Sequence, residues 1–283
     1  MKRSEFEAAA AALTEKAGGK TGVSMLELKT GESYDHNADW VLDHPASTIK
    51  LGIMCAALYK VQEGKITLAD KLTVKKEDKV PGSGVLQHLS DGTVLPLKDM
   101  LMLMIIQSDN TATNITMEYL GIDYVNYFFD TCKLTDIRLA RKLFDMEGIK
   151  KGIRNHVSAR DLSKLLYDLE KRSYLNEEYA SIGIDILMKQ QLLNKLPNFI
   201  HNYWDDKGIW YKYPIKTATK SGEDDTVEHD CGIIYTPKST IILSVVTKGT
   251  YPPAGIEYIG RMAELAVKYF DPESLVKTYK KED

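Results

Sequence analysis

The feature that most constrains the fold is the placement of strand-forming residues at both ends of the chain, with helical patterns between them. Alternating or β-branched segments indicate strands at 23–28, around 33–34, and at 216–222, 232–235 and 240–247. Turn residues separate neighbouring strands, Thr30-Gly31 near the start and 236–239 near the end. We therefore expect the two ends of the chain to share one sheet.

Helical patterns fill the region between these strands and also flank them. They occur at 8–16, 51–59, 97–106, 112–120, 122–132, 158–171, 177–194 and 256–270. The spacing of Ser4 and Glu7 predicts a capping box for the first helix. This order predicts an α/β (α+β) fold, with an antiparallel sheet, terminal helices and an all-helical lobe. We place the discontinuous sheet lobe at 1–43 and 203–283, and the helical lobe at 44–202.

Composition is that of a soluble globular protein of one large or two smaller domains. The chain has 283 residues, 43% of them hydrophobic and 27% charged, with a net charge of −3. No basic patch indicates nucleic acid or an anionic membrane, and no apolar run reaches the roughly 20 residues of a membrane span. Acidic residues interrupt the first segment, which is unlike a signal peptide. We expect a cytoplasmic protein, or a periplasmic or secreted one if a signal has been removed.

The remaining compositional signals are structural. Three cysteines, Cys55, Cys132 and Cys231, are scattered without metal-binding spacing, so we expect them to be reduced. Gly82-Ser83-Gly84 lacks the third glycine of a dinucleotide loop, and the six histidines lack zinc-site spacing. We therefore expect no cofactor and no metal.

Ser47 and Lys50 stand at the head of the apolar helix 51–59, between Pro45 and Gly64. Residues three apart share a helix face, and a hydroxyl at this end lies beside free N–H groups and the positive end of the helix dipole. Burial would lower the pKa of Lys50, making it a candidate base for Ser47. The pair alone also fits an N-cap serine with a solvated lysine.

Two further polar groups stand out along the chain. Ser108-Asp109-Asn110 directly follows the apolar helix 97–106, where three small polar residues are out of character for a core. Lys220-Ser221-Gly222 lies on the strand predicted at 216–222.

These three groups together resemble the S-x-x-K, S-D-N and K-[TS]-G motifs of serine β-lactamases and penicillin-binding proteins. They occur in the same order, about 60 and 110 residues apart, in a similar succession of helices and strands. The resemblance covers nearly the whole chain and is closest to class A, which Ser108-Asp109-Asn110-Thr111-Ala112 is very like. It implies a β-lactamase/transpeptidase-like fold.

The resemblance also implies a role for each matching residue. Ser47 would be the nucleophile and Lys50 a candidate base, while Ser108 would pass a proton to the leaving nitrogen. Asn110 would hold the substrate amide and Lys50.

On the predicted strand at 216–222, Lys220 would bind the substrate carboxylate, with Ser221 and Gly222 beside it. The backbone N–H groups of Ser47 and Glu223 would form the oxyanion hole, with Glu223 contributing only its backbone.

One departure from class A affects the general base. The family places a glutamate in a loop motif resembling R-x-x-R-x-E-x-x-L-N; here Arg138 and Arg141 match, but Leu143 takes the glutamate position. Asp145 or Glu147 could substitute, or neither could, because a base must reach the attacking water within about 3 Å.

This form of the loop, with His229-Asp230-Cys231-Gly232, is similar to a group of class A-like serine hydrolases. We expect His229 and Asp230 to precede a strand and to support Lys220 rather than carry chemistry.

Three functions follow as hypotheses. The first is a serine hydrolase, foremost a class A-like β-lactamase that acylates on Ser47. The second is a D-Ala-D-Ala carboxypeptidase or penicillin-binding protein, or an esterase or amidase of this fold, with slow β-lactam turnover. The third is a binding module that has lost catalysis. The expected partner is a small molecule, a β-lactam or an acyl-peptide or ester, and we expect a monomer that binds neither nucleic acid nor membrane.

Overall fold

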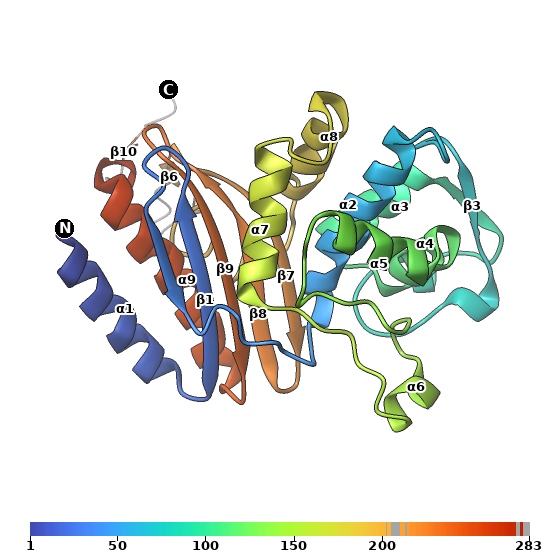
Figure 1. Ribbon diagram of the computed structural model, residues 1–283, viewed down its shortest axis with the longest axis horizontal. Helices are drawn as coiled ribbons and strands as arrows, with labels where there is room; N and C mark the ends of the chain where they lie inside the picture. The colour runs from blue at the N-terminus through green and yellow to red at the C-terminus, as the bar shows by residue number, and fades with distance from the viewer. Residues whose placement is uncertain (202, 205–209, 213, 276–277, 280–283) are drawn as a thin grey trace.

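The computed structural model describes residues 1–201, 203–204, 210–212, 214–275 and 278–279. Its main element is a five-stranded antiparallel sheet in the order β2-β1-β9-β8-β7 (Figure 1). The strands are β1 (Lys20–Glu27), β2 (Ser33–His36), β7 (Lys216–Asp224), β8 (Val227–Tyr235) and β9 (Thr240–Lys248). Because β1 pairs with β9 along its full length, the prediction that both ends of the chain share one sheet is confirmed.

The helices of the described residues fall where the sequence patterns lie. They are α1 (Arg3–Ala17), α2 (Ile49–Gln62), α3 (Leu97–Ile106), α4 (Asn110–Leu120), α5 (Ile122–Thr131), α6 (Met146–Lys150), α7 (Ala159–Glu170), α8 (Glu177–Met188) and α9 (Pro252–Phe270). Short helices are η1 (Ala46–Thr48), η2 (Lys76–Asp78), η3 (Leu86–His88) and η4 (Pro272–Leu275). Minor strands are β3 (Lys71–Val74), β4 (Thr93–Pro96), β5 (Tyr203–Trp204), β6 (Trp210–Lys212) and β10 (Thr278–Tyr279).

The sheet separates two apolar clusters. Phe6 of α1, Leu243 of β9 and Ile259 of α9 belong to one cluster, which joins the terminal helices to the sheet. The other cluster joins the remaining helices to Ile233 and Ile242 of the sheet. Figure 1 shows α7 between the sheet and the other helices, so the helical region and the sheet share a core through α7. The lobe boundaries at 43 and 203 stay a prediction, and part of 203–283 lies outside the described residues.

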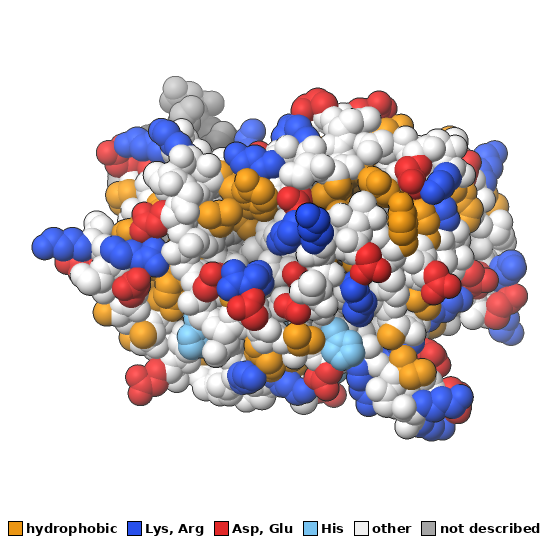
Figure 2. Space-filling view, in the orientation of Figure 1, with side chains coloured by type: hydrophobic (Ala, Val, Ile, Leu, Met, Phe, Trp, Pro, Cys, Tyr) orange, Lys and Arg blue, Asp and Glu red, His pale blue; other side chains and the backbone are white. Residues whose placement is uncertain are grey.

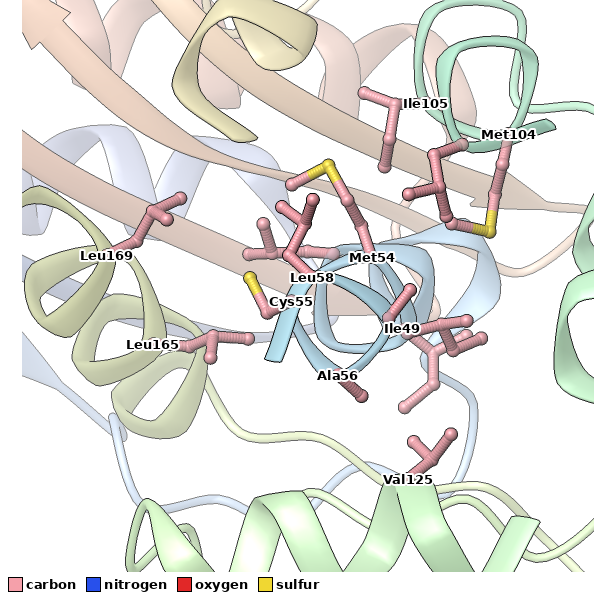
Figure 3. Close-up of a cluster of buried hydrophobic side chains, with 14 of the residues drawn as sticks. Ile49, Met54, Cys55, Ala56, Leu58, Met104, Ile105, Val125, Leu165 and Leu169 are labelled. Atoms are coloured by element: carbon pink, nitrogen blue, oxygen red, sulfur yellow. The ribbon is translucent and has the colours of Figure 1, made fainter. Parts of the chain in front are cut away.

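Helix α2 lies at the centre of the helical region and is buried on every side from Ile49 to Leu58. Figure 3 shows its side chains surrounded by Leu165 and Leu169 of α7 and by Val125 of α5. An apolar helix enclosed in this way cannot rotate or slide without exposing apolar surface. The position of everything attached to its N-terminal end is therefore fixed by the core.

The outer surface has a mixed charge. Figure 2 shows basic and acidic side chains interspersed over this face of the molecule, with smaller groups of apolar side chains between them. No helix among the described residues has the length and apolar character needed to cross a membrane.

Two sequence predictions about helix ends are wrong. Helix α1 begins at Arg3, so Ser4 lies inside its first turn; the Glu5 carboxylate accepts from Lys2 N (2.9 Å), and Glu7 pairs with Arg3. Helix α8 stops at Met188 rather than near residue 194. There the Gln190 side chain accepts from the N–H groups of residues 191 and 192, replacing the helical partners of these groups.

A third prediction is wrong as well. His229 and Asp230 do not precede a strand but lie within β8, fully buried. They follow Val227 and Glu228, and their strand pairing with β7 and β9 continues from those two residues. Cross-strand pairing thus extends the strand over polar residues that an apolar pattern does not include.

The close approach of α2 to α5 gives a test of this packing. A Cβ added at Gly52 would lie 2.6 Å from the ring of the buried Phe129. We expect Gly52→Ala to lower the free energy of unfolding by about 1 kcal/mol or more, because overpacking costs roughly 1–3 kcal/mol against a helix-propensity gain of about 1 kcal/mol. Urea denaturation measures the change.

A matched control is Gly183→Ala in α8, where the nearest atom is the tip of the Leu58 side chain at 3.1 Å. Its loss of stability should be smaller, because a flexible tip can move aside. Equal stability of Gly52→Ala and the unaltered protein would contradict this account of the α2–α5 contact.

Candidate active site

Ser47 lies in η1, which runs directly into α2. Ala46 before it has a φ of 46°, a left-handed conformation that is uncommon for a residue with a side chain. This turn places a half-buried Ser47 at the head of the buried helix, with Lys50 following one turn later. The structure thus brings Ser47 and Lys50 to the same end of α2, as their spacing predicted.

Strand β7 passes very close to this helix start. A Cβ added at Gly222 would lie 2.8 Å from Ser47 N and 2.9 Å from Thr48 N. Only a glycine allows such an approach. The Gly222–Glu223 stretch of β7 therefore lies beside the backbone N–H of Ser47, the arrangement that an oxyanion hole made by Ser47 and Glu223 requires.

The Lys50 amine is buried and held by the segment between α3 and α4. Its Nζ donates to Ser108 O at 2.6 Å and to Asn110 Oδ1 at 2.8 Å, and it lies 3.1 Å from Ser108 Oγ. Burial and the nearby charge of Lys220 hold the pKa of Lys50 well below its usual value, which favours the neutral amine. A neutral amine has two N–H groups and one lone pair, so the two carbonyl oxygens leave the lone pair free.

Lys220 reaches the same hydroxyl from the other side. Its Nζ lies 3.3 Å from Ser108 Oγ, so this oxygen stands between two lysines. Burial lowers the pKa of Lys220 to about 8, although the nearby charge of Asp230 acts in the opposite direction. At neutral pH Lys220 therefore keeps its charge, whereas the environment of Lys50 favours loss of the proton.

Ser108 and Asn110 are held in place by the residue between them. Asp109 caps α4 through Ala112 N (2.9 Å) and accepts from the backbone N–H groups of residues 85 and 86. Ser108 itself has a φ of 52°, which turns the chain sharply between α3 and α4. The central residue of this motif is therefore structural, and it fixes the two residues that contact Lys50.

The loop between Arg138 and Val157 carries the departure noted in the sequence. Leu143 is held by two backbone bonds to the Asn114 side chain, Leu143 N to Oδ1 and Nδ2 to Leu143 O, both 2.9 Å. Asn114 lies one turn after Asn110 on α4 and is buried. The loop is thus fixed to the site at Leu143, the position where class A enzymes carry their glutamate.

Asp145 and Glu147 are placed differently. Asp145 caps α6 through Gly148 N (2.9 Å), and Glu147 is exposed and pairs with Lys150. Figure 1 shows α6 well away from α2 at the tip of the loop. Within the described ranges, no hydrogen bond joins either carboxylate to Ser47, Lys50 or Ser108.

Behind Lys220 lie the two polar residues of β8. Burial raises the pKa of Asp230 to about 6, so it is mainly ionised at neutral pH and can stabilise the Lys220 charge. His229 Nε2 donates to His44 O (2.9 Å) and its Nδ1 accepts from Thr247 N (3.1 Å). Burial lowers the pKa of His229 to about 4, so the imidazole is neutral and links β8 to the segment leading into Ser47.

The sequence reasoning missed two residues of this region. Asn114 could have been found from its spacing, since it shares a face of α4 with Asn110. Lys195 had no signal, because it lies in an irregular segment after α8, yet it is fully buried and contacts Gly222 and Glu223. In the part of the chain that the structure describes, no group of histidine, cysteine or acidic side chains could hold a metal ion.

Comparison with known proteins follows from this geometry. Residues 5–270 match the Beta-lactamase enzyme family. A β-lactamase of Rhodobacter capsulatus is 34% identical over 111 residues, which cover 39% of this chain and 37% of that protein. The β-lactamase VEB-1 of Pseudomonas aeruginosa is 25% identical over 167 residues, 55% of this chain and 56% of that protein. The chain therefore matches about one third to just over half of the length of these relatives.

Solved structures match over most of their length. A β-lactamase of Sphaerobacter thermophilus has a TM-score of 0.83 and 30% identity, covering 95% of this chain and 98% of that one. PBP-A has a TM-score of 0.83 and 25% identity, covering 95% and 97%. A second PBP-A structure, equally similar, is a Leu-to-Glu variant in an acyl-enzyme complex with penicillin G.

The antiparallel sheet with its helices has the β-lactamase/transpeptidase-like fold, as these structures confirm. Because the family match runs through almost the whole chain, from α1 to the end of α9, this protein belongs to the Beta-lactamase enzyme family.

Proposed function

We propose that this protein is a serine hydrolase that is acylated on Ser47 by β-lactams and releases the acyl group slowly. The observation that carries the proposal is the Ser108 hydroxyl, placed between the Lys50 and Lys220 amines beside the Ser47 helix. Nucleophile, base and proton relay of a serine acylation are then all present. A binding module that has lost catalysis has no use for such a set.

Acylation would use the site as follows. The Lys50 lone pair takes the Ser47 proton, and Ser47 Oγ attacks the β-lactam carbonyl carbon. The N–H groups of Ser47 and Glu223 stabilise the resulting oxyanion. Ser108 passes a proton to the leaving nitrogen as the amide bond breaks, and Lys220 holds the substrate carboxylate.

Deacylation needs a base that activates water, which typically contributes about 10²–10⁴-fold. Leu143 occupies the family position of that base, and its backbone is held there by Asn114. This favours the behaviour of a penicillin-binding protein, acting on acyl-peptides or esters, over rapid β-lactam hydrolysis. Similarity to PBP-A supports the same reading.

The first test is covalent labelling. Intact-mass spectrometry during incubation with benzylpenicillin should show a one-to-one adduct that accumulates, and Ser47→Ala should show none while keeping its thermal unfolding midpoint. An adduct on Ser47→Ala would overturn the nucleophile assignment, and rapid turnover without accumulation would overturn slow deacylation.

The second test concerns the loop. Leu143→Glu should shorten the adduct lifetime by roughly 10²-fold or more, because it places a carboxylate at the position that Asn114 holds. Asp145→Asn is the matched control: asparagine can still cap α6 but cannot act as a base. Its adduct lifetime should equal that of the unaltered protein, and a sharply longer one would make Asp145 the base.

The third test is the pH dependence of acylation. Lys220 loses its proton as the pH rises through about 8, so acylation by a substrate with a carboxylate should fall above this pH. Losing a charge-assisted hydrogen bond costs roughly 1.5–3 kcal/mol, or about 10–100-fold in kcat/KM. A neutral ester should show no such fall, and Lys220→Ala should abolish it. Equal alkaline decline for both substrates would remove carboxylate binding from Lys220.

A further inference from the structure

Lys195 is a fully buried lysine with no place in the family motifs. Its Nζ donates to Gly222 O at 2.9 Å and pairs with the carboxylates of Glu223 (2.8 Å) and Glu228 (2.7 Å). Burying an unpaired ammonium costs several kcal/mol, so the two carboxylates account for its presence in the core. They do not account for the third contact, which is to a backbone carbonyl of β7.

That carbonyl belongs to the peptide group whose N–H is the proposed oxyanion donor. Gly222 C=O and Glu223 N–H lie in one plane and point in opposite directions across a trans peptide bond. A cation fixed on the oxygen therefore fixes the direction of the N–H. The same glycine lies against Ser47 N, so the other proposed donor is immediately beside it.

The contact also changes the strength of the donor. An ammonium on a carbonyl oxygen draws electron density from the peptide group, and hydrogen bonds in such a chain strengthen one another in a low-dielectric interior. The Glu223 N–H thereby becomes a better donor to developing negative charge, which is where oxyanion holes act.

We propose that Lys195 is a positioning residue of the oxyanion hole, which orients and polarises the Gly222–Glu223 peptide for acyl transfer on Ser47. The inference rests on the proposed function. Lys195 acts only through this peptide, and its effect belongs to the transition state and the acyl-enzyme carbonyl rather than to ground-state binding.

A simpler role would be to neutralise Glu223 and Glu228. Two variants separate the roles. Glu228→Gln removes one carboxylate and leaves Lys195 on Gly222 O. Lys195→Met with Glu228→Gln removes the cation and leaves no uncompensated buried carboxylate, because the Glu223 side chain is 54% exposed.

The readout is the acyl-enzyme carbonyl, because its infrared stretching frequency reports polarisation by the oxyanion hole. Each protein is acylated with benzylpenicillin carrying ¹³C in the β-lactam carbonyl, and the labelled band is isolated by difference. We expect the band at higher frequency in the double variant and unchanged in Glu228→Gln. The acylation rate constant of the double variant should fall roughly 10-fold, less than the ~10²–10³-fold that removal of a donor costs, with ground-state Kd unchanged.

Lys195→Gln with Glu228→Gln keeps a neutral donor near the carbonyl, and its band should be intermediate; it decides the matter if the Met variant does not fold. A band at the unaltered frequency in the double variants would overturn the inference while the proposed function stands. Absence of any adduct on the unaltered protein would overturn the proposed function and this inference with it.

Discussion

The site depends on one buried amine. Lys50 lies on a helix enclosed by the core, and its Nζ contacts Ser108 and Asn110 at the start of α4. Keeping a charge at this depth is costly, so the surroundings favour the neutral amine and leave a lone pair beside Ser47. The apolar packing that makes α2 immobile is thus also what makes Lys50 a base.

Three lysines are fully buried within this small region, and their neighbours give them different properties. Lys50 contacts neutral oxygens, whereas Lys220 lies near the ionised Asp230 and keeps its proton to a pH of about 8. Lys195 is paired directly with two carboxylates. One residue type can therefore serve as base, as substrate cation and as support for the backbone, because the carboxylates are placed beside two of the three.

The loop from Arg138 to Val157 decides the fate of the acyl-enzyme. Asn114 holds the backbone at Leu143 and is indifferent to the side chain there, since both of its bonds go to main-chain atoms. The loop can therefore keep its attachment while the side chain changes between an acid and a leucine. This separates acylation, which needs α2, α4 and β7, from deacylation, which needs the loop.

The sequence by itself determined the fold and most of the site. Periodicity gave the helices and the shared sheet, because apolar spacing follows directly from helix and strand geometry. Ser47, Lys50, Ser108, Asn110 and Lys220 were predicted because short motifs on regular elements keep their spacing in space. Cap positions and the start of β8 were predicted less well, because side-chain bonds such as those of Glu5 and Gln190 fix them.

Tertiary structure alone decided the rest. Asp145 and Glu147 stood as candidate bases in the sequence, yet folding commits Asp145 to the cap of α6 and leaves Glu147 on the surface. Lys195 was one lysine among many until the chain after α8 brought it beneath Gly222. The physical reason is the same in both cases: burial and partner choice depend on contacts between segments far apart in the chain, and no local pattern encodes them.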